Sequence, residues 1–289
     1  MAEFRRQFCG WMVVALLLGS APPLWSQSLT VTAPQWRLRH AEALQMDQPG
    51  RQVEHLSAGF LGLPYVASPL IGSPTQDEVL VNDLVRVDCF TLLDFVEALR
   101  RSVDLSNFDQ TLLQVRYQGA ELSYRSRHHF FSAWGDANRP HLRDVTADVA
   151  GPSLQRLEKI LNRKQDGGLW LEGIPTWQRE LAYLPTAALD GVPLARLQTG
   201  DYVGIVSPLP GLDVSHTGIL LWREETLYLR HASSRASTGK VLDEPLLPYL
   251  QGKPGLVVLR PTTPPLSPHN PHSEINCCIE NVKSPMLAK

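Results

Sequence analysis

Apolar and polar positions divide the chain into a helical first half and a strand-rich second half. From Cys89 onward, apolar side chains recur at helical spacing while charged side chains take the opposite face; the apolar positions are Leu92, Leu93, Val96 and Leu99. Asp88 stands where a helix N-cap belongs. The pattern therefore predicts a helix that begins at Cys89.

The other local signals are shorter. Helical character is expected over residues 27–45, 54–65, 106–124, 151–163 and 174–184, with an irregular segment over 69–77 and an extended approach over 79–87. Beyond residue 191 the period falls to two, which predicts strands over 202–206, 215–222, 227–231 and 255–259. Helices followed by an antiparallel sheet make an α+β fold.

Charge and composition narrow the class of protein. The 289 residues carry 27 basic and 29 acidic side chains, a formal net charge of −2, so nothing favours nucleic acid or an anionic surface as a partner. With 43% hydrophobic and 19% charged residues, the composition is that of a globular chain with one sizeable core. The glycine motifs of nucleotide-binding folds do not occur in the sequence.

The two ends of the chain are set apart from the fold. Arg5 and Arg6 precede a short apolar run over 11–18, which predicts a signal peptide over 1–26, export to a periplasm or outside the cell, and no stable membrane insertion after its removal. Residues 261–289 are rich in proline and are expected to be a disordered tail. A single domain over 27–260 remains. Its one cysteine is Cys89, and with the tail pair Cys277 and Cys278 the count is odd, so no disulfide framework is expected.

A cysteine in the first turn of a helix has a chemical consequence. The free N–H groups and partial positive charge there lower the pKa of a thiol and can hold an oxyanion. Asp88 acts in the opposite sense, because a neighbouring carboxylate disfavours the thiolate. A nucleophilic Cys89 would also need an imidazole partner.

The strand pattern selects two of the nine histidines. If residues 223–226 form a four-residue hairpin loop, Trp222 lies opposite Leu227, and the same register places His216 and His231 on one face as diagonal neighbours. A loop longer or shorter by one residue would place them on opposite faces. In the favoured register one imidazole can orient the other as a base.

Each of these residues also has a structural interpretation. Cys89 fits a core position, His216 a buried strand position and His231 a strand end. A zinc site is a further alternative without the usual helical motif, drawing on His128, His129, His216, His231 and Asp213. The aromatic residues over 130–134 fit a core, although Arg127 and Trp134 could together receive a sugar or an acidic peptide. No serine-hydrolase elbow motif is present in the sequence.

Six stretches, taken in order, resemble the N-acetylmuramoyl-L-alanine amidase-like family, related to the NlpC-type papain-like cell-wall hydrolases. They are VDCFT at 87–91, RYQG at 116–119, YRSRHHF at 124–130, GDYVG at 200–204, DVSHTG at 213–218 and HASS at 231–234. The resemblance covers about residues 50–260. It departs from the family pattern at Phe90, at Leu92 and Leu93, and at Gly135, which affects packing more than chemistry.

The resemblance implies a papain-like α+β fold, with the nucleophile on N-terminal helices, the histidines on a C-terminal antiparallel sheet, and helical insertions. It implies Cys89 as nucleophile, His216 as base and His231 as the third polar member of a Cys-His-His triad, acting through a thioester without metal or organic cofactor. The residues expected to contact substrate are Tyr65, Asp88, Arg127, Trp134 and Ser215.

The implied substrate is peptidoglycan or its muropeptide fragments. The favoured reaction is cleavage between the sugar lactyl group and L-alanine. An endopeptidase cutting within the stem peptide on the same triad, a non-catalytic wall-binding module, and acyl transfer by the same thiol are the alternatives. Which amide bond is cut is not decided by these residues.

Overall fold

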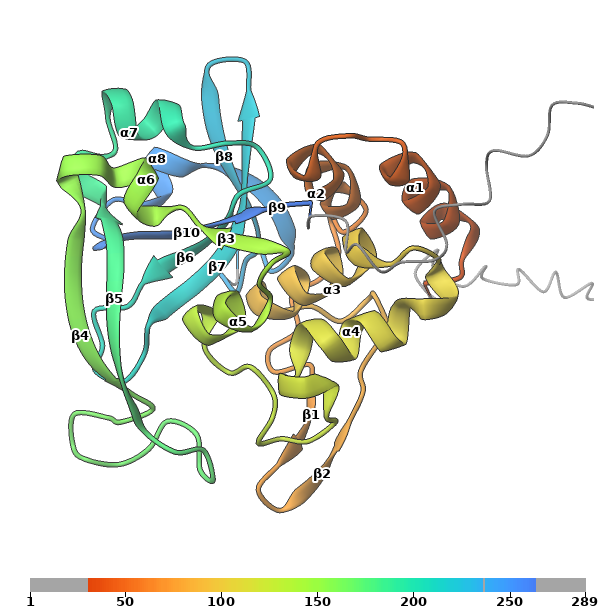
Figure 1. The fold of residues 1–289 in the computed structure, drawn as a ribbon, viewed down its shortest axis with the longest axis horizontal. Coiled ribbons are helices and arrows are strands. Elements are labelled where there is room, and N and C mark those ends of the chain that lie inside the picture. The colour runs from red at the N-terminus through yellow and green to blue at the C-terminus, as the bar shows by residue number, and fades with distance from the viewer. Residues whose placement is uncertain (1–30, 236, 264–289) are drawn as a thin grey trace, which may run out of the picture.

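The computed structural model describes residues 31–235 and 237–263, and its helices gather mainly in the first half of the chain (Figure 1). The helices are α1 (Pro34–Leu44), α2 (Pro49–Ala58), α3 (Cys89–Arg101), α4 (Phe108–Arg116), α5 (Phe131–Ala137), α6 (Thr146–Ala150), α7 (Gly191–Arg196) and α8 (Leu246–Tyr249). The predicted helix start at Cys89 is confirmed. The predicted signal peptide over 1–26 and most of the predicted tail lie outside the described residues.

The strands form a two-stranded hairpin and one large antiparallel sheet. The hairpin pairs β1 (Ile71–Ser73) with β2 (Gln76–Val79). The sheet contains β3 (Leu142–Asp144), β4 (Gln155–Leu161), β5 (Trp177–Pro185), β6 (Tyr202–Val206), β7 (Val214–Arg223), β8 (Thr226–Ala232), β9 (Val241–Pro245) and β10 (Gly255–Pro261). Its order is β4-β5-β10-β6-β7-β8-β9, and β3 pairs with β10. The mixed α+β class with an antiparallel sheet is as predicted.

Alternate residues of the central strands enter two separate cores. Tyr202 and Ile219 pack with α1–α4 on one face, whereas Val203 and Leu220 pack on the other face with residues of α6 and α8. The strict alternation arises because successive side chains of a strand point to opposite faces of the sheet. Burial of both faces explains why the central strands are apolar at nearly every position.

Helix α3 lies at the centre of the helical half, between the other helices and the sheet (Figure 1). Nine of its thirteen residues are buried. It packs against α2 and α4 and, on its other side, against β7 and β8. Because it is enclosed on several sides, its polar residues must find partners within the protein.

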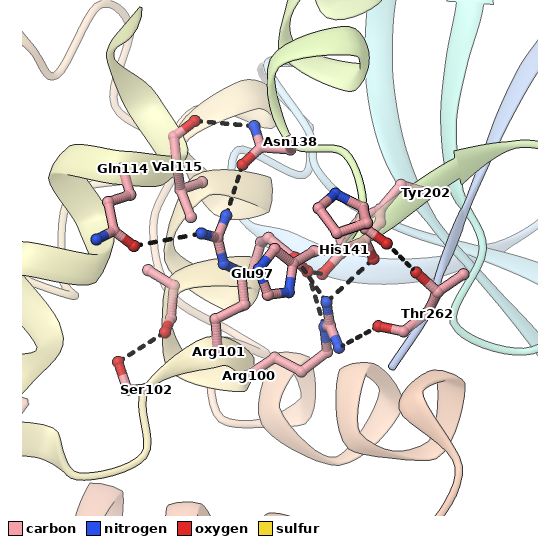
Figure 2. Close-up of polar contacts among 12 residues, drawn as sticks. Glu97, Arg100, Arg101, Ser102, Gln114, Val115, Asn138, His141, Tyr202 and Thr262 are labelled. Atoms are coloured by element: carbon pink, nitrogen blue, oxygen red, sulfur yellow. Dashed lines mark hydrogen bonds and ion pairs between the residues drawn. The ribbon is translucent and has the colours of Figure 1, made fainter. Parts of the chain in front are cut away.

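The C-terminal end of α3 carries a buried polar network, shown in Figure 2. Glu97 accepts two hydrogen bonds from Arg100, at 2.7 and 2.8 Å, and one at 3.0 Å from the hydroxyl of Tyr202. Arg100 also donates to the carbonyl groups of His141 and Thr262. The network therefore ties α3 to β6 and to the segments beside β3 and β10.

Two predicted helices are strands. Residues 151–163 and 174–184 contain many helix-forming residues, but they form β4 and β5, which pair along their length from Gln155–Tyr183 to Leu161–Trp177. Pairing between distant segments overrides local propensity. The segment 69–77, predicted to be irregular, contributes the β1–β2 hairpin, and the edge strand β9 was not predicted.

Among the helices formed by residues 31–235 and 237–263, none combines the length and apolarity needed to cross a lipid bilayer.

Candidate active site

The start of α3 is fixed by the residue before it. The Oδ1 atom of Asp88 accepts from the N–H groups of Phe90 and Thr91, at 3.0 and 2.8 Å, and the Thr91 hydroxyl accepts from the Asp88 N–H at 2.9 Å. This is a reciprocal capping box. It confirms the predicted N-cap and presents Cys89 on the first turn.

The β7–β8 hairpin has the predicted register. Trp222 pairs with Leu227, and the ladder continues by one further pair at the turn, Arg223 with Thr226. In this register Gly218 falls opposite His231, so His216 and His231 share a face as diagonal neighbours. Their rings are hydrogen bonded, with 2.8 Å between His216 Nε2 and His231 Nδ1.

A side-chain hydrogen bond joins strand β7 to the start of helix α3. The Thr217 hydroxyl donates to the carbonyl oxygen of Cys89 at 2.6 Å, across 128 positions of sequence. Thr217 directly follows His216, so the start of α3 lies against the part of β7 that carries the imidazole. The backbone at Cys89 therefore lies against the segment of β7 that carries His216, and His216 is hydrogen bonded to His231.

The thiol does not have the lowered pKa expected at a helix start. Burial raises the pKa of Cys89 to about 11, the negative charge of Asp88 raises it further, and hydrogen bonds from Thr217 lower it. The amides of Phe90 and Thr91 are engaged by Asp88, so they are not the groups that stabilise the sulfur. The resting side chain is a neutral thiol.

Both imidazoles are neutral as well. Burial lowers the pKa of His216 to about 3, and the neighbouring His231, Lys253 and Arg235 act in the same direction. Burial also lowers the pKa of His231, partly offset by the hydrogen bond and charge of Glu244. A neutral imidazole beside a thiol can accept a proton, which an imidazolium cannot.

Two of the predicted substrate contacts lie beside the thiol. Tyr65 is held at the backbone by Gly239, and burial raises the pKa of its hydroxyl, with smaller contributions from Cys89 and Asp88. The Asp88 side chain lines a cavity of about 370 Å³. Of the two residues, Asp88 lines this cavity, and Tyr65 lies near enough to Cys89 for the charges of the two side chains to interact.

Arg127 lines the same cavity. Phe90, the residue that follows Cys89 in the sequence, also lines it. The Arg127 guanidinium pairs with Glu78 at 3.3 Å and lies over the ring of Tyr124. Its Nε atom is buried without a hydrogen-bond partner. Arg127 therefore lines the cavity while its guanidinium is held by Glu78.

Trp134 corrects the prediction of a substrate contact. Its side chain is fully buried, packs on Phe131 and Tyr202, and donates from Nε1 to Asp94 at 3.0 Å. It belongs to the core between α3 and the sheet. In the aromatic segment 130–134, Trp134 therefore contributes to the core and not to a binding surface.

Ser215 lies in a β-bulge. Ile205 pairs with His216 and the next residue, Val206, pairs with Val214, so Ser215 is the additional residue. Its side chain is exposed, with a weak hydrogen bond of 3.4 Å to the Ile205 carbonyl. The bulge directly precedes His216 and helps to set the direction of its side chain.

Two residues of the site were missed by the sequence analysis. Glu244 on β9 accepts from or pairs with His231 Nε2 at 2.7 Å, and Tyr249 on α8 packs against both imidazole rings at 5.9 and 4.9 Å. Neither residue lies in a recognisable motif. Glu244 could have been found only by predicting that β9 pairs with β8, which places Glu244 beside His231.

Within the part of the chain that the structure describes, no group of three or more histidine, cysteine, aspartate or glutamate side chains is placed to hold a metal ion.

Comparison with known proteins supplies a family. The model of a family described as N-acetylmuramoyl-L-alanine amidase-like matches residues 55–256. No curated protein matches the chain.

Solved structures share the fold. An N-acetylmuramoyl-L-alanine amidase from Bacteroides uniformis is 29% identical, with a TM-score of 0.62 over 74% of this chain and 99% of that one. A protein from Legionella pneumophila has a TM-score of 0.67 at 22% identity, over 78% of this chain and 93% of that one. The second likeness concerns the fold alone.

Proposed function

Because this chain belongs to the N-acetylmuramoyl-L-alanine amidase-like family, we propose that it is an exported cysteine hydrolase that cleaves peptidoglycan between the sugar lactyl group and L-alanine. The family indicates a hydrolase and a peptidoglycan-type substrate. The observation that supports the cysteine mechanism is the bond from Thr217 to the Cys89 carbonyl at the start of α3, because Thr217 directly follows His216, which is hydrogen bonded to His231.

In this proposal the fold is of the papain-like, NlpC type. In such a fold the nucleophile stands on a helix and the base on an antiparallel sheet, and the packing of α3 on β7 supports this arrangement. The described residues supply both elements in that order along the chain.

The first half of the reaction forms a thioester. Cys89 Sγ attacks the lactyl carbonyl carbon as His216 takes the thiol proton, because the resting pair is neutral. The C–N bond then breaks, and His216 returns that proton to the leaving amine of L-alanine. The N–H of Cys89 and the Tyr65 hydroxyl are the donors we assign to the oxyanion, since Asp88 engages the next two amides.

The second half releases the acid. Water attacks the thioester carbonyl and gives a proton to His216, and that proton returns to the sulfur as the C–S bond breaks. The products are a lactyl carboxylate on the sugar and a peptide with a free N-terminal amine. No cofactor enters this scheme.

Export is part of the proposal, because the polymer lies outside the cytoplasmic membrane. Its support is the charged and apolar pattern over residues 1–26, with a periplasmic or secreted location as the result. Cell fractionation of the producing organism would test it, and the protein found wholly in the cytoplasm would contradict it.

The experiment that tests the reaction is digestion of purified muropeptides by the full chain, analysed by mass spectrometry. We expect intact stem peptides that begin with a free L-alanine. Peptide fragments cut within the stem would instead establish the endopeptidase alternative.

Cys89→Ala is expected to lower the rate at least roughly 10³-fold, because no other nucleophile forms the thioester. Cys89→Ser serves as the size-matched variant, and thermal unfolding of both checks that they fold. Wild-type rates in a folded Cys89→Ala protein would rule out the cysteine mechanism.

A further inference from the structure

A continuous chain of hydrogen bonds runs from His216 through His231 to Glu244. His216 Nε2 lies 2.8 Å from His231 Nδ1, and His231 Nε2 lies 2.7 Å from Glu244 Oε2. The other carboxylate oxygen of Glu244 accepts from Arg235 at 2.7 Å. Each ring therefore uses a specific nitrogen toward the next group.

The backbone places Glu244 for this contact. His231 pairs with Leu242 across the β8–β9 ladder, and Glu244 is two residues further along β9. Residues two apart share a face of a strand, so Glu244 is the diagonal neighbour of His231, as His231 is of His216. The arrangement repeats the same step across three adjacent strands.

The chain of bonds determines which nitrogen carries each proton. A carboxylate only accepts hydrogen bonds, so His231 Nε2 must carry a hydrogen. In a neutral ring His231 Nδ1 is then an acceptor, and His216 Nε2 must donate to it. One nitrogen remains on His216, Nδ1, and it is left with its lone pair.

We propose that Glu244 is a positioning residue that sets the tautomer of His216 through His231, leaving His216 Nδ1 as the proton acceptor for the Cys89 thiol. The site is then a relay of four residues, Cys89, His216, His231 and Glu244. The inference rests on the proposed function in taking Cys89 and His216 as the reacting pair.

Two further contacts hold the relay in place. The ring of Tyr249 packs on His231 with centroids 4.9 Å apart, and Arg235 lies over that same ring at 4.9 Å. Arg235 therefore touches both Glu244 and Tyr249, which restricts rotation of the carboxylate and of the imidazole beside it.

Several charged and titratable groups face the relay. Cys89 comes from α3, and Arg235 from the connection between β8 and β9. The others are Asp243 and Glu244 of β9, Tyr249 of α8, and Lys253 in the turn after α8. Of these, only Glu244 is hydrogen bonded to an imidazole of the pair. The tautomer is therefore assigned to Glu244 and not to the general charge around it.

Nitrogen NMR of the imidazoles tests the proposal without any substrate. Long-range proton–nitrogen spectra of the wild type are expected to show hydrogen on Nε2 of both His216 and His231. Glu244→Gln has nearly the same shape, but an amide can donate as well as accept, so it is expected to populate the other tautomer of both rings.

The matched control is Glu225→Gln, which removes the same charge at the exposed tip of the β7–β8 hairpin. It is expected to leave the imidazole spectra unchanged. A wild-type His216 with its hydrogen on Nδ1, or unchanged tautomers in Glu244→Gln, would overturn the proposal.

Kinetics give the second measurement. Glu244→Gln is expected to lower kcat roughly 100-fold with KM within about twofold, because an orienting carboxylate acts on the proton transfer and not on binding. A rise in KM at unchanged kcat would contradict the assignment.

The two levels of inference are separable. Full activity in Cys89→Ala would remove the proposed function, and the NMR spectra would still decide whether Glu244 sets the tautomers. An inactive Cys89→Ala protein with unaltered tautomers in Glu244→Gln would remove the inference about Glu244 alone.

Discussion

The two ends of helix α3 bury similar polar groups with opposite results. At the C-terminal end, Glu97 and Arg100 are almost wholly buried, at 0% and 4% exposure, and they form an ion pair. Burial lowers the pKa of Arg100, but Glu97 and Tyr202 raise it more, and the net value is above the ordinary one. The ion pair at this end is charged and hydrogen bonded.

At the N-terminal end, burial is not compensated by opposite charge. Cys89 and His216 stay neutral, because burial raises the pKa of the thiol and lowers that of the imidazole. The comparison indicates what separates a structural from a reactive cluster: compensated burial holds elements together, and uncompensated burial leaves a proton free to move.

The largest effect on stability is expected when the compensated end is broken. Glu97→Ala leaves Arg100 buried without its partner and is expected to lower the free energy of unfolding by about 3–5 kcal/mol. Urea unfolding measures it. Activity per folded molecule is expected to be unchanged, since the site lies at the other end of α3.

Glu180→Ala is the control for that change. Glu180 pairs with Arg156 at the surface, where both side chains are more than half exposed. It is expected to lower the free energy of unfolding by less than about 1 kcal/mol. Equal losses of unfolding free energy in the two variants would show that Glu97 does not compensate the burial of Arg100 in the network of Figure 2.

The reactive end should make the fold sensitive to acid. The folded pKa of His216 is about 3, below the unfolded value of about 6.5, so the unfolded chain holds the additional proton between these values. Stability contributed by this residue is complete above pH 6.5 and falls as the pH falls. The slope is at most about 1.4 kcal/mol per pH unit.

Urea unfolding of the wild type and His216→Gln at pH 7.0 and 5.0 isolates this contribution. The loss of stability on acidification is expected to be smaller in the variant. His141→Gln gives the counterpart at the network end, where burial lowers the pKa of His141 to about 4, and a similar change is expected because both folded pKa values lie below pH 5.0. Identical pH slopes in wild type and His216→Gln would contradict the prediction.

The smallest expected effect concerns the residue before the thiol. Asp88→Asn keeps a cap acceptor but removes a charge that raises the pKa of Cys89, so that pKa should fall below about 11. Alkylation of the peptide that contains Cys89 is expected to be faster at pH 8, by up to roughly tenfold, which corresponds to one pKa unit.

Asp104→Asn is the matched variant, because Asp104 caps the next turn through the Ser106 N–H at 2.7 Å. It should leave the alkylation rate of Cys89 unchanged. Slower alkylation in Asp88→Asn would show that the cap geometry outweighs the charge.

What could be predicted from the sequence was local. The helix start needs only Asp88 and the spacing after Cys89, and the histidine register needs only the short turn between Trp222 and Leu227. Both signals lie within a few residues of the feature that they determine. The packing of the start of α3 against the part of β7 that carries His216, seen in the bond from Thr217 to the Cys89 carbonyl, is in addition a long-range contact that these local signals do not specify.

What could not be predicted depends on distant partners. The local sequence of β4 favours a helix, and only its pairing with β5 makes it a strand. The edge strand β9 is short, and its apolar and polar residues alternate little. Glu244 was missed with β9. The raised pKa of Cys89 was missed because it comes from burial under elements far away in the sequence.

The bond from the Thr217 hydroxyl to the Cys89 carbonyl has a mechanical consequence. Thr217 holds the start of α3 against β7, and the residue before it, His216, begins the hydrogen-bond chain to His231 and Glu244. Because successive side chains of a strand point to opposite faces, this part of β7 contacts α3 through one residue and the imidazole chain through the next. A shift of α3 against the sheet would therefore break the bond to Thr217 and leave the imidazole chain intact.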